Sequence, residues 1–232
     1  MEPLVQISID VTTTAEALEI AEVAVSAGVD WLEAGTPLVL GDGLHAVTAL
    51  KEQFPQNTLV ADLKIMDGGF QETKMAAEAG ADLVVVMGRA PVATVHACVA
   101  AGKQYGCQIM GDVMLGAGGG RFDPVEQAKD LEAAGVDYVI LHTSYDARHT
   151  VPMDPLKHVR AVVAAVGVPI QTVGGLTLEQ LMTAPQAGVA VVVVGAPLVI
   201  ANERFAAAGE LSQLEIVLRE VVQRVKGVAG LK

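Results

Sequence analysis

Four segments of the chain repeat one pattern, in which a helix-like stretch stops at a glycine and a run rich in branched apolar residues follows. They are 26–33 (SAGVDWLE), 78–86 (EAGADLVVV), 133–141 (AAGVDYVIL) and 186–194 (QAGVAVVVV). Glycine suits the stop because the position after a helix often has a left-handed backbone, which favours a residue without Cβ. Successive glycines of this set are 52, 55 and 53 residues apart. The pattern predicts four strands, each preceded by a helix.

A weaker strand signal lies between these segments and before the first of them. The additional apolar runs are 4–10 (LVQISID), 57–62 (NTLVAD), 107–112 (CQIMGD) and 168–173 (VPIQTV). Together the two sets predict eight strands, one for about every 26 residues.

Helical periodicity fills the gaps between the predicted strands. Residues 12–27 open on a threonine-rich cap and then place apolar residues at i, i+3 and i+4. The segment 123–134 begins with Asp123 as a candidate N-cap and Pro124 at the first helical position. Residues 211–226 predict an amphipathic C-terminal helix.

Eight alternating strand–helix units, with no linker or low-complexity tract, predict a single (β/α)8 (TIM) barrel domain over residues 1–232. A doubly wound open sheet is the alternative, although it usually has fewer strands and a less even rhythm. In either fold, chemistry belongs at the carboxyl ends of the strands.

Ionisable residues stand where five of the predicted strands end. Taken singly, a carboxylate after an apolar run is more often a helix N-cap or a solvated loop residue. Convergence of such residues from five different strands on one ring favours a functional site instead. The residues are Asp10, Glu33, Asp62, Asp112 and His142, which we expect to end strands 1, 2, 3, 5 and 6.

Lys64 follows Asp62 by two positions, so on an extended chain both side chains point to the same face. Burying either charge alone is costly, and we expect the two to pair with each other or with a ligand. Glu33 and Asp62 come from adjacent strands and offer the oxygen ligands suited to Mg²⁺ or Mn²⁺, with substrate and water completing an octahedron. A divalent ion beside a lysine can hold a cis-enediolate.

The last two strands end in glycine-containing turns, TVGGLT (172–177) and VVVGAP (192–197). Barrels frequently bind a phosphate with the loops after strands 7 and 8, using backbone amides. Gly174, Gly175 and Gly195 allow close backbone approach there, although glycine pairs also serve simple turns.

Charge and composition exclude several classes of protein. The formal net charge is −12 and no basic stripe offsets it, which argues against a nucleic-acid partner. Residues are 52% hydrophobic but only 3% aromatic, as expected for a parallel α/β core of small branched side chains. The N-terminus has no signal-peptide pattern and the apolar run 188–200 is too short to span a bilayer, so we expect a cytoplasmic protein. Cys98 and Cys107 are interpreted as buried thiols rather than a disulfide.

The stretch ADLKIMDGG (61–69) resembles the D-x-K-x-x-D motif of the orotidine 5′-monophosphate decarboxylase superfamily. The resemblance is closest to the branch of 3-hexulose-6-phosphate synthases and 3-keto-L-gulonate-6-phosphate decarboxylases. It extends over nearly the whole chain, through ISID, LEAGTPLVLGDGL, AAEAGAD, AGVDYVILHTSYDA, VGGL and VVVVGAP.

The resemblance implies a role for each polar position. Glu33 and Asp62 would be Mg²⁺ ligands, Lys64 would stabilise the enediolate, and His142 would act as acid or base. Asp67 would reach across a homodimer interface into the partner's site, and Asp62 counts among the catalytic residues as well. A phosphorylated sugar would be bound by a wider set, namely Asp10, Asp112, Gly174, Gly175, Gly195 and Ala196.

The choice within the branch depends on arginines. The decarboxylases carry arginines after the strand-6 histidine and in the strand-8 loop, where this chain reads HTSYD and VGAP. We therefore predict an Mg²⁺-dependent aldolase that condenses D-ribulose 5-phosphate with formaldehyde. The alternatives are a decarboxylase of a β-keto sugar-acid phosphate such as 3-keto-L-gulonate 6-phosphate, and an inactive sugar-phosphate-binding protein.

Some positions depart from both family patterns. The stretch 114–124 (MLGAGGGRFDP) is glycine-rich and contains Arg121, which could belong to a lid for a different substrate or to a mobile surface loop. Arg148 and His149 stand where the family tends to have Gln-Ala, and Ile65 and Gly68 also differ from the usual synthase residues.

Overall fold

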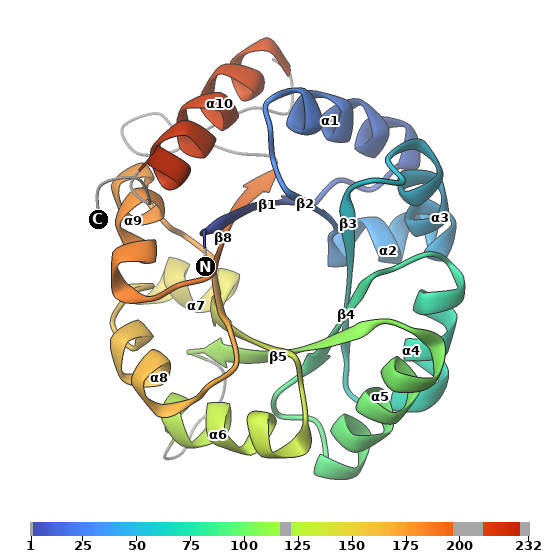
Figure 1. The fold of residues 1–232 in the computed structure, drawn as a ribbon, viewed down its shortest axis with the longest axis vertical. Coiled ribbons are helices and arrows are strands. Elements are labelled where there is room, and N and C mark those ends of the chain that lie inside the picture. Colours follow the sequence, from blue (N-terminus) through green and yellow to red (C-terminus); the bar gives the residue numbers. More distant parts are fainter. Residues whose placement is uncertain (1, 117–121, 197–210, 228–232) are drawn as a thin grey trace.

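The computed structural model describes residues 2–116, 122–196 and 211–227, and eight parallel strands form a closed barrel within them (Figure 1). Closure is direct, because β8 pairs with β1 from Leu4↔Val191 to Ile9↔Ala196. This pairing confirms the single-domain (β/α)8 barrel and excludes the open sheet. The strands are β1 (Leu4–Ile9), β2 (Trp31–Ala34), β3 (Thr58–Ile65), β4 (Leu83–Met87), β5 (Gln108–Leu115), β6 (Tyr138–Thr143), β7 (Ile170–Val173) and β8 (Val191–Ala196).

Helices surround the barrel on the outside (Figure 1). The C-terminal helix, predicted over 211–226, spans Leu211–Gly227 and packs against the first helix. The helices are α1 (Thr14–Ser26), α2 (Thr36–Asp42), α3 (Leu44–Gln53), α4 (Gly69–Glu78), α5 (Val92–Tyr105), α6 (Pro124–Ala134), α7 (Tyr145–Thr150), α8 (Val159–Ala165), α9 (Leu178–Thr183) and α10 (Leu211–Gly227), with the 3-10 turn η1 at Ala184–Ala187.

The predicted helix boundaries have identifiable chemical causes. The hydroxyl of Thr13 accepts a hydrogen bond from the amide of Glu16 at the start of α1. Asp123 caps α6 by accepting from the amide of Val125, with Pro124 in the first turn, as predicted. The four glycines of the repeat have left-handed backbones, with φ of 89°, 103°, 94° and 97° at Gly28, Gly80, Gly135 and Gly188.

The aspartate of the Gly-x-Asp repeat ties consecutive strands together at the amino-terminal end of the barrel. Asp30, Asp82 and Asp137 each accept a backbone hydrogen bond of 2.8–2.9 Å from the strand before their own. The fourth copy has Ala190, which keeps only the backbone bond from its amide to the carbonyl of Ile170. This repeated contact helps set the register of β1–β2, β3–β4 and β5–β6, and it stabilises the fold at the end opposite the chemistry.

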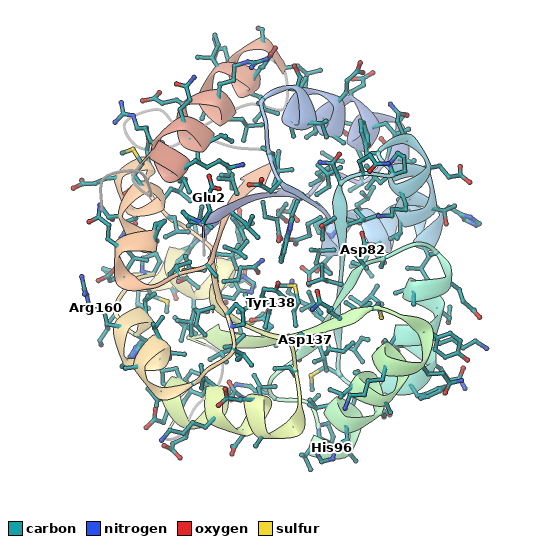
Figure 2. All side chains as sticks on the ribbon, viewed as in Figure 1. Glu2, Asp82, His96, Asp137, Tyr138 and Arg160 are labelled. Carbon is teal, nitrogen blue, oxygen red and sulfur yellow. The ribbon has the colours of Figure 1, made fainter. Side chains whose placement is uncertain are left out.

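Two apolar clusters fill the molecule. The larger lies between the sheet and the helices and contains buried Cys98 and Cys107, which are free thiols as predicted. Burial raises the pKa of both thiols, to about 11 for Cys107, so neither is reactive. The smaller cluster lies within the ring of strands, where Trp31 meets Tyr138 edge to face with 5.4 Å between the ring centroids; Tyr138 is labelled in Figure 2. In the described ranges, no helix combines the length and apolarity needed to cross a membrane.

Candidate active site

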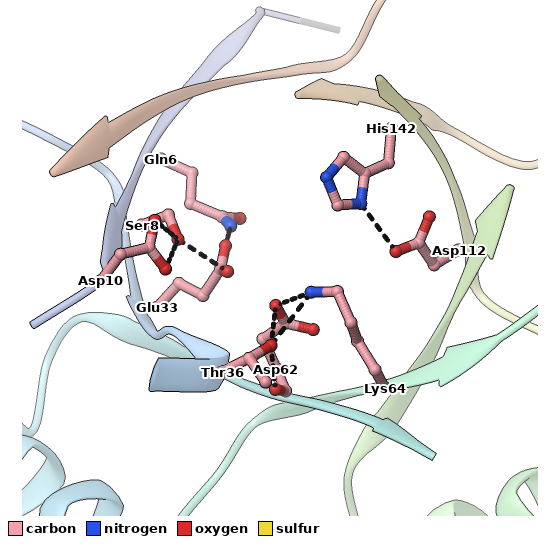
Figure 3. Close-up of polar contacts among 9 residues, drawn as sticks. All are labelled: Gln6, Ser8, Asp10, Glu33, Thr36, Asp62, Lys64, Asp112 and His142. Carbon is pink, nitrogen blue, oxygen red and sulfur yellow. Dashed lines mark hydrogen bonds and ion pairs between the residues drawn. The ribbon is translucent and has the colours of Figure 1, made fainter. Parts of the chain in front are cut away.

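Inward-facing positions on four strands carry an apolar residue of the smaller cluster and, two positions later, an ionisable one. Because side chains alternate along a strand, residues two apart share a face, and the second of each pair lies nearer the carboxyl end. These four strands therefore place apolar side chains deeper in the barrel and ionisable ones at its mouth, where Figure 3 shows the ionisable residues. The pairs are Trp31/Glu33, Val60/Asp62, Met110/Asp112 and Ile140/His142.

Lys64 and Asp62 form an ion pair at the centre of this mouth (Figure 3). The same Oδ2 atom of Asp62 accepts from the hydroxyl of Thr36 at 2.8 Å, and Lys64 Nζ donates to that hydroxyl at 3.0 Å. Asp62 is only 6% exposed, so its charge is held by these two partners rather than by water.

The predicted pairing is present, but its predicted cause, an extended chain from Asp62 to Lys64, is wrong. Lys64 has φ of +47°, the left-handed region, and it is the one non-glycine residue of the described chain with such a backbone. The β3–β4 register jumps from Ala61↔Val84 to Ile65↔Val86, so β3 contains two extra residues there. This bulge aims the ammonium into the barrel mouth. Such strain costs on the order of 1–3 kcal/mol and is typical of functional sites.

Glu33 is held by a chain of buried polar residues that crosses from β7 to β2. Gln171 donates from Nε2 to Oε1 of Gln6 at 2.8 Å, and Gln6 donates in turn to Oε2 of Glu33. The hydroxyl of Ser8 donates to the other oxygen, Oε1, at 2.9 Å. Because Gln171 occupies the oxygen of the Gln6 amide, the amide nitrogen is directed at the carboxylate. Both oxygens of Glu33 are thereby fixed.

The mouth concentrates negative charge. Burial, followed by the charges of Asp62 and Asp10, raises the pKa of Glu33 well above its usual value. Burial and Asp62 also raise the pKa of Asp10 to about 6. For Lys64, burial lowers the pKa, but the attraction of Asp62, Asp112 and Glu33 outweighs it and the pKa ends above its ordinary value. Lys64 therefore remains a cation at neutral pH.

His142 is paired with a buried carboxylate. Its Nδ1 lies 3.0 Å from Oδ2 of Asp112, which is 1% exposed. A carboxylate accepts hydrogen bonds, so this contact places the proton of the neutral ring on Nδ1. Nε2, facing the open mouth in Figure 3, is then free to exchange a proton with a bound molecule.

The donor set suits a hard divalent cation with few protein ligands. Among the described residues no group of three or more acidic, histidine or cysteine side chains is arranged to hold a metal. Glu33 and Asp62 nevertheless approach each other in the mouth, and the buried Oδ1 atom of Asp62 has no hydrogen-bond partner. Mg²⁺ typically takes one or two carboxylates and keeps water or substrate oxygens in its other positions, which these residues fit.

Four of the predicted strand ends are followed by further strand residues: Glu33 and His142 miss the end by one residue, and Asp62 and Asp112 by more. Asp62 and Asp112 each lie three residues before the end of β3 and β5, whereas Asp10 directly follows β1. The strands run on because Ile65 pairs with Val86 beyond the bulge, and Val113–Leu115 pair with Leu141–Thr143. Both carboxylates consequently lie deeper in the barrel than predicted.

Asp67 lies apart from the residues in the mouth. It is exposed, in the turn between β3 and α4, and its Oδ1 accepts from the amide of Gly68 at 2.8 Å. It also lines a shallow surface cavity of about 310 Å³ with Phe70 and Thr94. Within this chain it contacts neither Lys64 nor Asp62 by a hydrogen bond or ion pair.

The predicted phosphate glycines lie at the same rim as the charged residues. Gly174 and Gly175 follow β7 with φ of 94° and 70°. Gly195 and Ala196 close β8, and a Cβ on Gly195 would be 3.9 Å from Oδ2 of Asp10. The predicted lid residue Arg121 and most of the glycines beside it lie outside the described residues.

Sequence reasoning did not identify Gln6, Ser8, Thr36 and Gln171 as members of the site. A signal was available for two of them, because Gln6 and Ser8 precede Asp10 at spacings of two on one strand. Gly35 is a fifth residue that the sequence reasoning missed. A Cβ there would be 2.2 Å from Oδ1 of Asp10, so only glycine leaves room for this carboxylate.

Fold and site together define a (β/α)8-barrel protein with carboxylates, an ammonium and an imidazole gathered at the carboxyl ends of its strands, where barrel enzymes keep their chemistry. Residues 3–211 match the orotidine 5′-phosphate decarboxylase / HUMPS family. The chain is 34% identical over 211 residues to a 3-hexulose-6-phosphate synthase of Bacillus subtilis (strain 168), covering 90% of this chain and 97% of that protein. It belongs to this family, within the branch of 3-hexulose-6-phosphate synthases and 3-keto-L-gulonate-6-phosphate decarboxylases.

Solved structures give the same grouping. The crystal structure of 3-hexulose-6-phosphate synthase from Salmonella typhimurium superimposes with a TM-score of 0.79 at 30% identity, covering 94% of this chain and 99% of that one. The structure of 3-keto-L-gulonate-6-phosphate decarboxylase from Vibrio cholerae O1 biovar El Tor str. N16961 gives 0.75 at 28% identity, with 97% and 99% coverage.

Proposed function

We propose that this protein is a lyase of the 3-hexulose-6-phosphate synthase type, condensing D-ribulose 5-phosphate with formaldehyde. The observation that carries the proposal is the Lys64 ammonium, held as a cation by Asp62 at the centre of an acidic mouth. A fixed positive charge in a partly buried site stabilises an anion that develops during reaction and does little for a neutral ground state. An enediolate of a ketose is such an anion.

His142 supplies the proton transfers in this proposal. Its Nε2 removes a proton from C1 of the ketose, and the electron pair of that C–H bond becomes the enediolate. Asp112 stabilises the imidazolium that forms, through its contact with Nδ1. C1 then attacks the carbonyl carbon of formaldehyde, a C–C bond forms, and the new alkoxide takes the proton back from Nε2. Atoms and charges balance without an external acid or base.

Glu33 and Asp62 would hold Mg²⁺, or Mn²⁺, in this proposal. When bound, the ion would supply Lewis-acid stabilisation of the enediolate. The chain prepares for this by orienting Glu33 through Ser8 and Gln6 and by leaving Oδ1 of Asp62 unoccupied by any hydrogen bond. Such supporting contacts typically change metal affinity 10- to 100-fold when removed.

The proposed active unit is a homodimer. Asp67 is exposed and bonds only to the amide of Gly68 among the described residues, which supports a role in the site of a partner subunit. The phosphate of the sugar would bind at the rim formed by Gly174, Gly175, Gly195 and Ala196, while Asp10 would contact sugar hydroxyls.

The test is to incubate D-ribulose 5-phosphate with the protein and Mg²⁺ in D₂O without aldehyde. Exchange of the C1 proton, followed by a hexulose phosphate when formaldehyde is added, is the expected result. Absence of exchange with a fully folded, Mg²⁺-supplemented sample would contradict the proposal.

A second candidate is decarboxylation of 3-keto-L-gulonate 6-phosphate. The His142–Asp112 pair favours it as an alternative, because loss of CO₂ from such an acid leaves the same type of enediolate, which His142 could protonate. The likeness to the Vibrio cholerae decarboxylase also supports it. Release of CO₂ from this substrate, without C1 exchange of ribulose 5-phosphate, would favour the second candidate.

A further inference from the structure

Arg148 lies against the glycine turn that follows β7. It is on α7, directly after β6, and the pairing of His142 with Val173 brings the ends of β6 and β7 side by side. A Cβ on Gly175 would stand 3.0 Å from Cδ and 3.1 Å from Nη1 of Arg148. The guanidinium thus reaches the turn only because Gly175 has no side chain.

The guanidinium is oriented but has no carboxylate partner among the described residues. It lies over the ring of Tyr145, 4.9 Å from the ring centroid, which limits its freedom by a cation–π contact. None of the ion pairs in the described ranges includes Arg148, whereas Arg219 and Arg224 each pair with a glutamate one turn away. A half-buried cation without a counter-ion, at the rim of the barrel, is a candidate anion ligand.

The charge distribution of the mouth favours such a cation for binding a phosphorylated substrate. Four carboxylates face the mouth, and the Lys64 ammonium that lies among them is already paired with Asp62. A phosphate dianion near β8 would also approach Asp10, whose Oδ2 lies close to Gly195. Beside the turn after β7, the nearby charged group is the guanidinium of Arg148. Binding of a phosphate is therefore more favourable at this turn than near β8.

We propose that Arg148 binds the phosphate group of the substrate over the Gly174–Gly175 turn. The planar guanidinium fork matches two phosphate oxygens, and the two left-handed glycines allow the anion to approach the backbone. The identity of the sugar rests on the proposed function, but recognition of the phosphate itself does not. Arg148 would then fix the end of the substrate remote from the reacting carbon.

Calorimetric titration with inorganic phosphate tests the phosphate contact independently of turnover. Arg148→Met should weaken phosphate binding about tenfold or more, and Arg148→Lys should weaken it less. Arg160→Met is the matched control, since Arg160 is exposed on α8 and projects outward (Figure 2); it should bind as the wild type does. Equal affinity of folded Arg148→Met and wild type, or a wild type without phosphate affinity, would overturn the proposal.

Kinetics with D-ribulose 5-phosphate then separate the two proposals. Arg148→Met should raise KM about tenfold while kcat for C1 exchange changes little, because the contact is remote from the reacting carbon. Phosphate binding that depends on Arg148, in a protein without exchange activity, would refute the synthase proposal and leave the Arg148 site standing. A loss in kcat with unchanged KM would instead count against Arg148 as a phosphate ligand.

Discussion

Nδ1 of His142 on β6 lies 3.0 Å from Oδ2 of Asp112 on β5, although the two residues are not opposite each other in the sheet. His142 is level with Met114, and Asp112 stands two positions earlier on the same face. The contact is therefore diagonal, from a deep carboxylate up to a ring nearer the mouth. This geometry fixes the ring and leaves its second nitrogen directed at the mouth.

Asp112→Asn should reduce kcat for C1 exchange by at least about 100-fold with little change in KM. The amide can donate to Nδ1, which would place the ring proton on Nε2 and remove the base. Exchange rates by NMR measure the effect. Asp130→Asn, an exposed change on α6, should retain wild-type rates. An Asp112→Asn protein with near-normal exchange would contradict the assigned proton path.

Substitution of Lys64 separates its charge from its backbone conformation. Lys64→Ala and Lys64→Gly should both lose about 100- to 1000-fold in activity, because each removes the ammonium. Lys64→Gly should nevertheless be more stable than Lys64→Ala by about 1 kcal/mol, since alanine resists the left-handed backbone at φ +47°. Urea denaturation of the pair measures the difference. Equal stabilities would show that the bulge relaxes when the lysine is absent.

Asp10 makes the metal-free protein less stable as pH rises. Its pKa is about 6 in the folded state and 3.8 ordinarily, so the folded state binds the extra proton between these values. Stability is lost as pH rises from about 4 to about 6 and stays lost above that range. Asp10→Asn should therefore be more stable than wild type at pH 8, by up to about 3 kcal/mol, and equal to it at pH 3.5.

Urea denaturation of both proteins in EDTA at several pH values measures this difference. Asp146→Asn, exposed on α7, is the control, and the difference between its free energy of unfolding and that of the wild type should not change with pH. A gain at pH 8 no larger than that of the control would show that Asp10 is ionised in the folded protein without penalty.

Gln171→Met should weaken divalent-metal binding about tenfold by releasing the amide of Gln6 from its fixed orientation. Methionine has nearly the same volume, so the packing of the barrel is retained. Titration with Mn²⁺ followed by electron paramagnetic resonance measures free and bound ion directly. Gln108→Met, an exposed change at the start of β5, should leave the affinity unchanged. If both variants bind Mn²⁺ with equal affinity, the hydrogen bonds that run from Gln171 on β7 through Gln6 do not position Glu33.

Complementation tests the role proposed for Asp67. Lys64→Ala and Asp67→Ala proteins should each be inactive, but mixed dimers have one site with both wild-type residues. Random mixing should restore about a quarter of the sites. Activity after unfolding and refolding the two variants together measures the recovery. If mixed dimers confirmed by mass spectrometry remained inactive, Asp67 would not act across an interface.

Local patterns predicted the elements of this fold well, and the partners of individual side chains poorly. Gly28 and its three counterparts stop helices because they adopt a left-handed backbone, and this preference depends on the glycine residue itself. The bulge at Lys64 carried no such signal, because lysine has no preference for that conformation and the surrounding structure imposes it. The sequence predicts Asp62 and Asp112 at strand ends, and the prediction is wrong because strand length depends on pairing with neighbouring strands, which a local pattern does not show.

The sequence by itself determined the eight-unit rhythm, the parallel barrel, and the set of ionisable residues that follow apolar runs on five strands. These features depend on residues close together in the chain. Only the tertiary structure decided which of them meet. Gln171 and Gln6 are 165 positions apart, and they touch because closure of β8 onto β1 leaves only β8 between β7 and the first strand. Arg148 and Gly175 likewise meet through the pairing of β6 with β7, since side-chain contacts follow strand register, which no local pattern specifies.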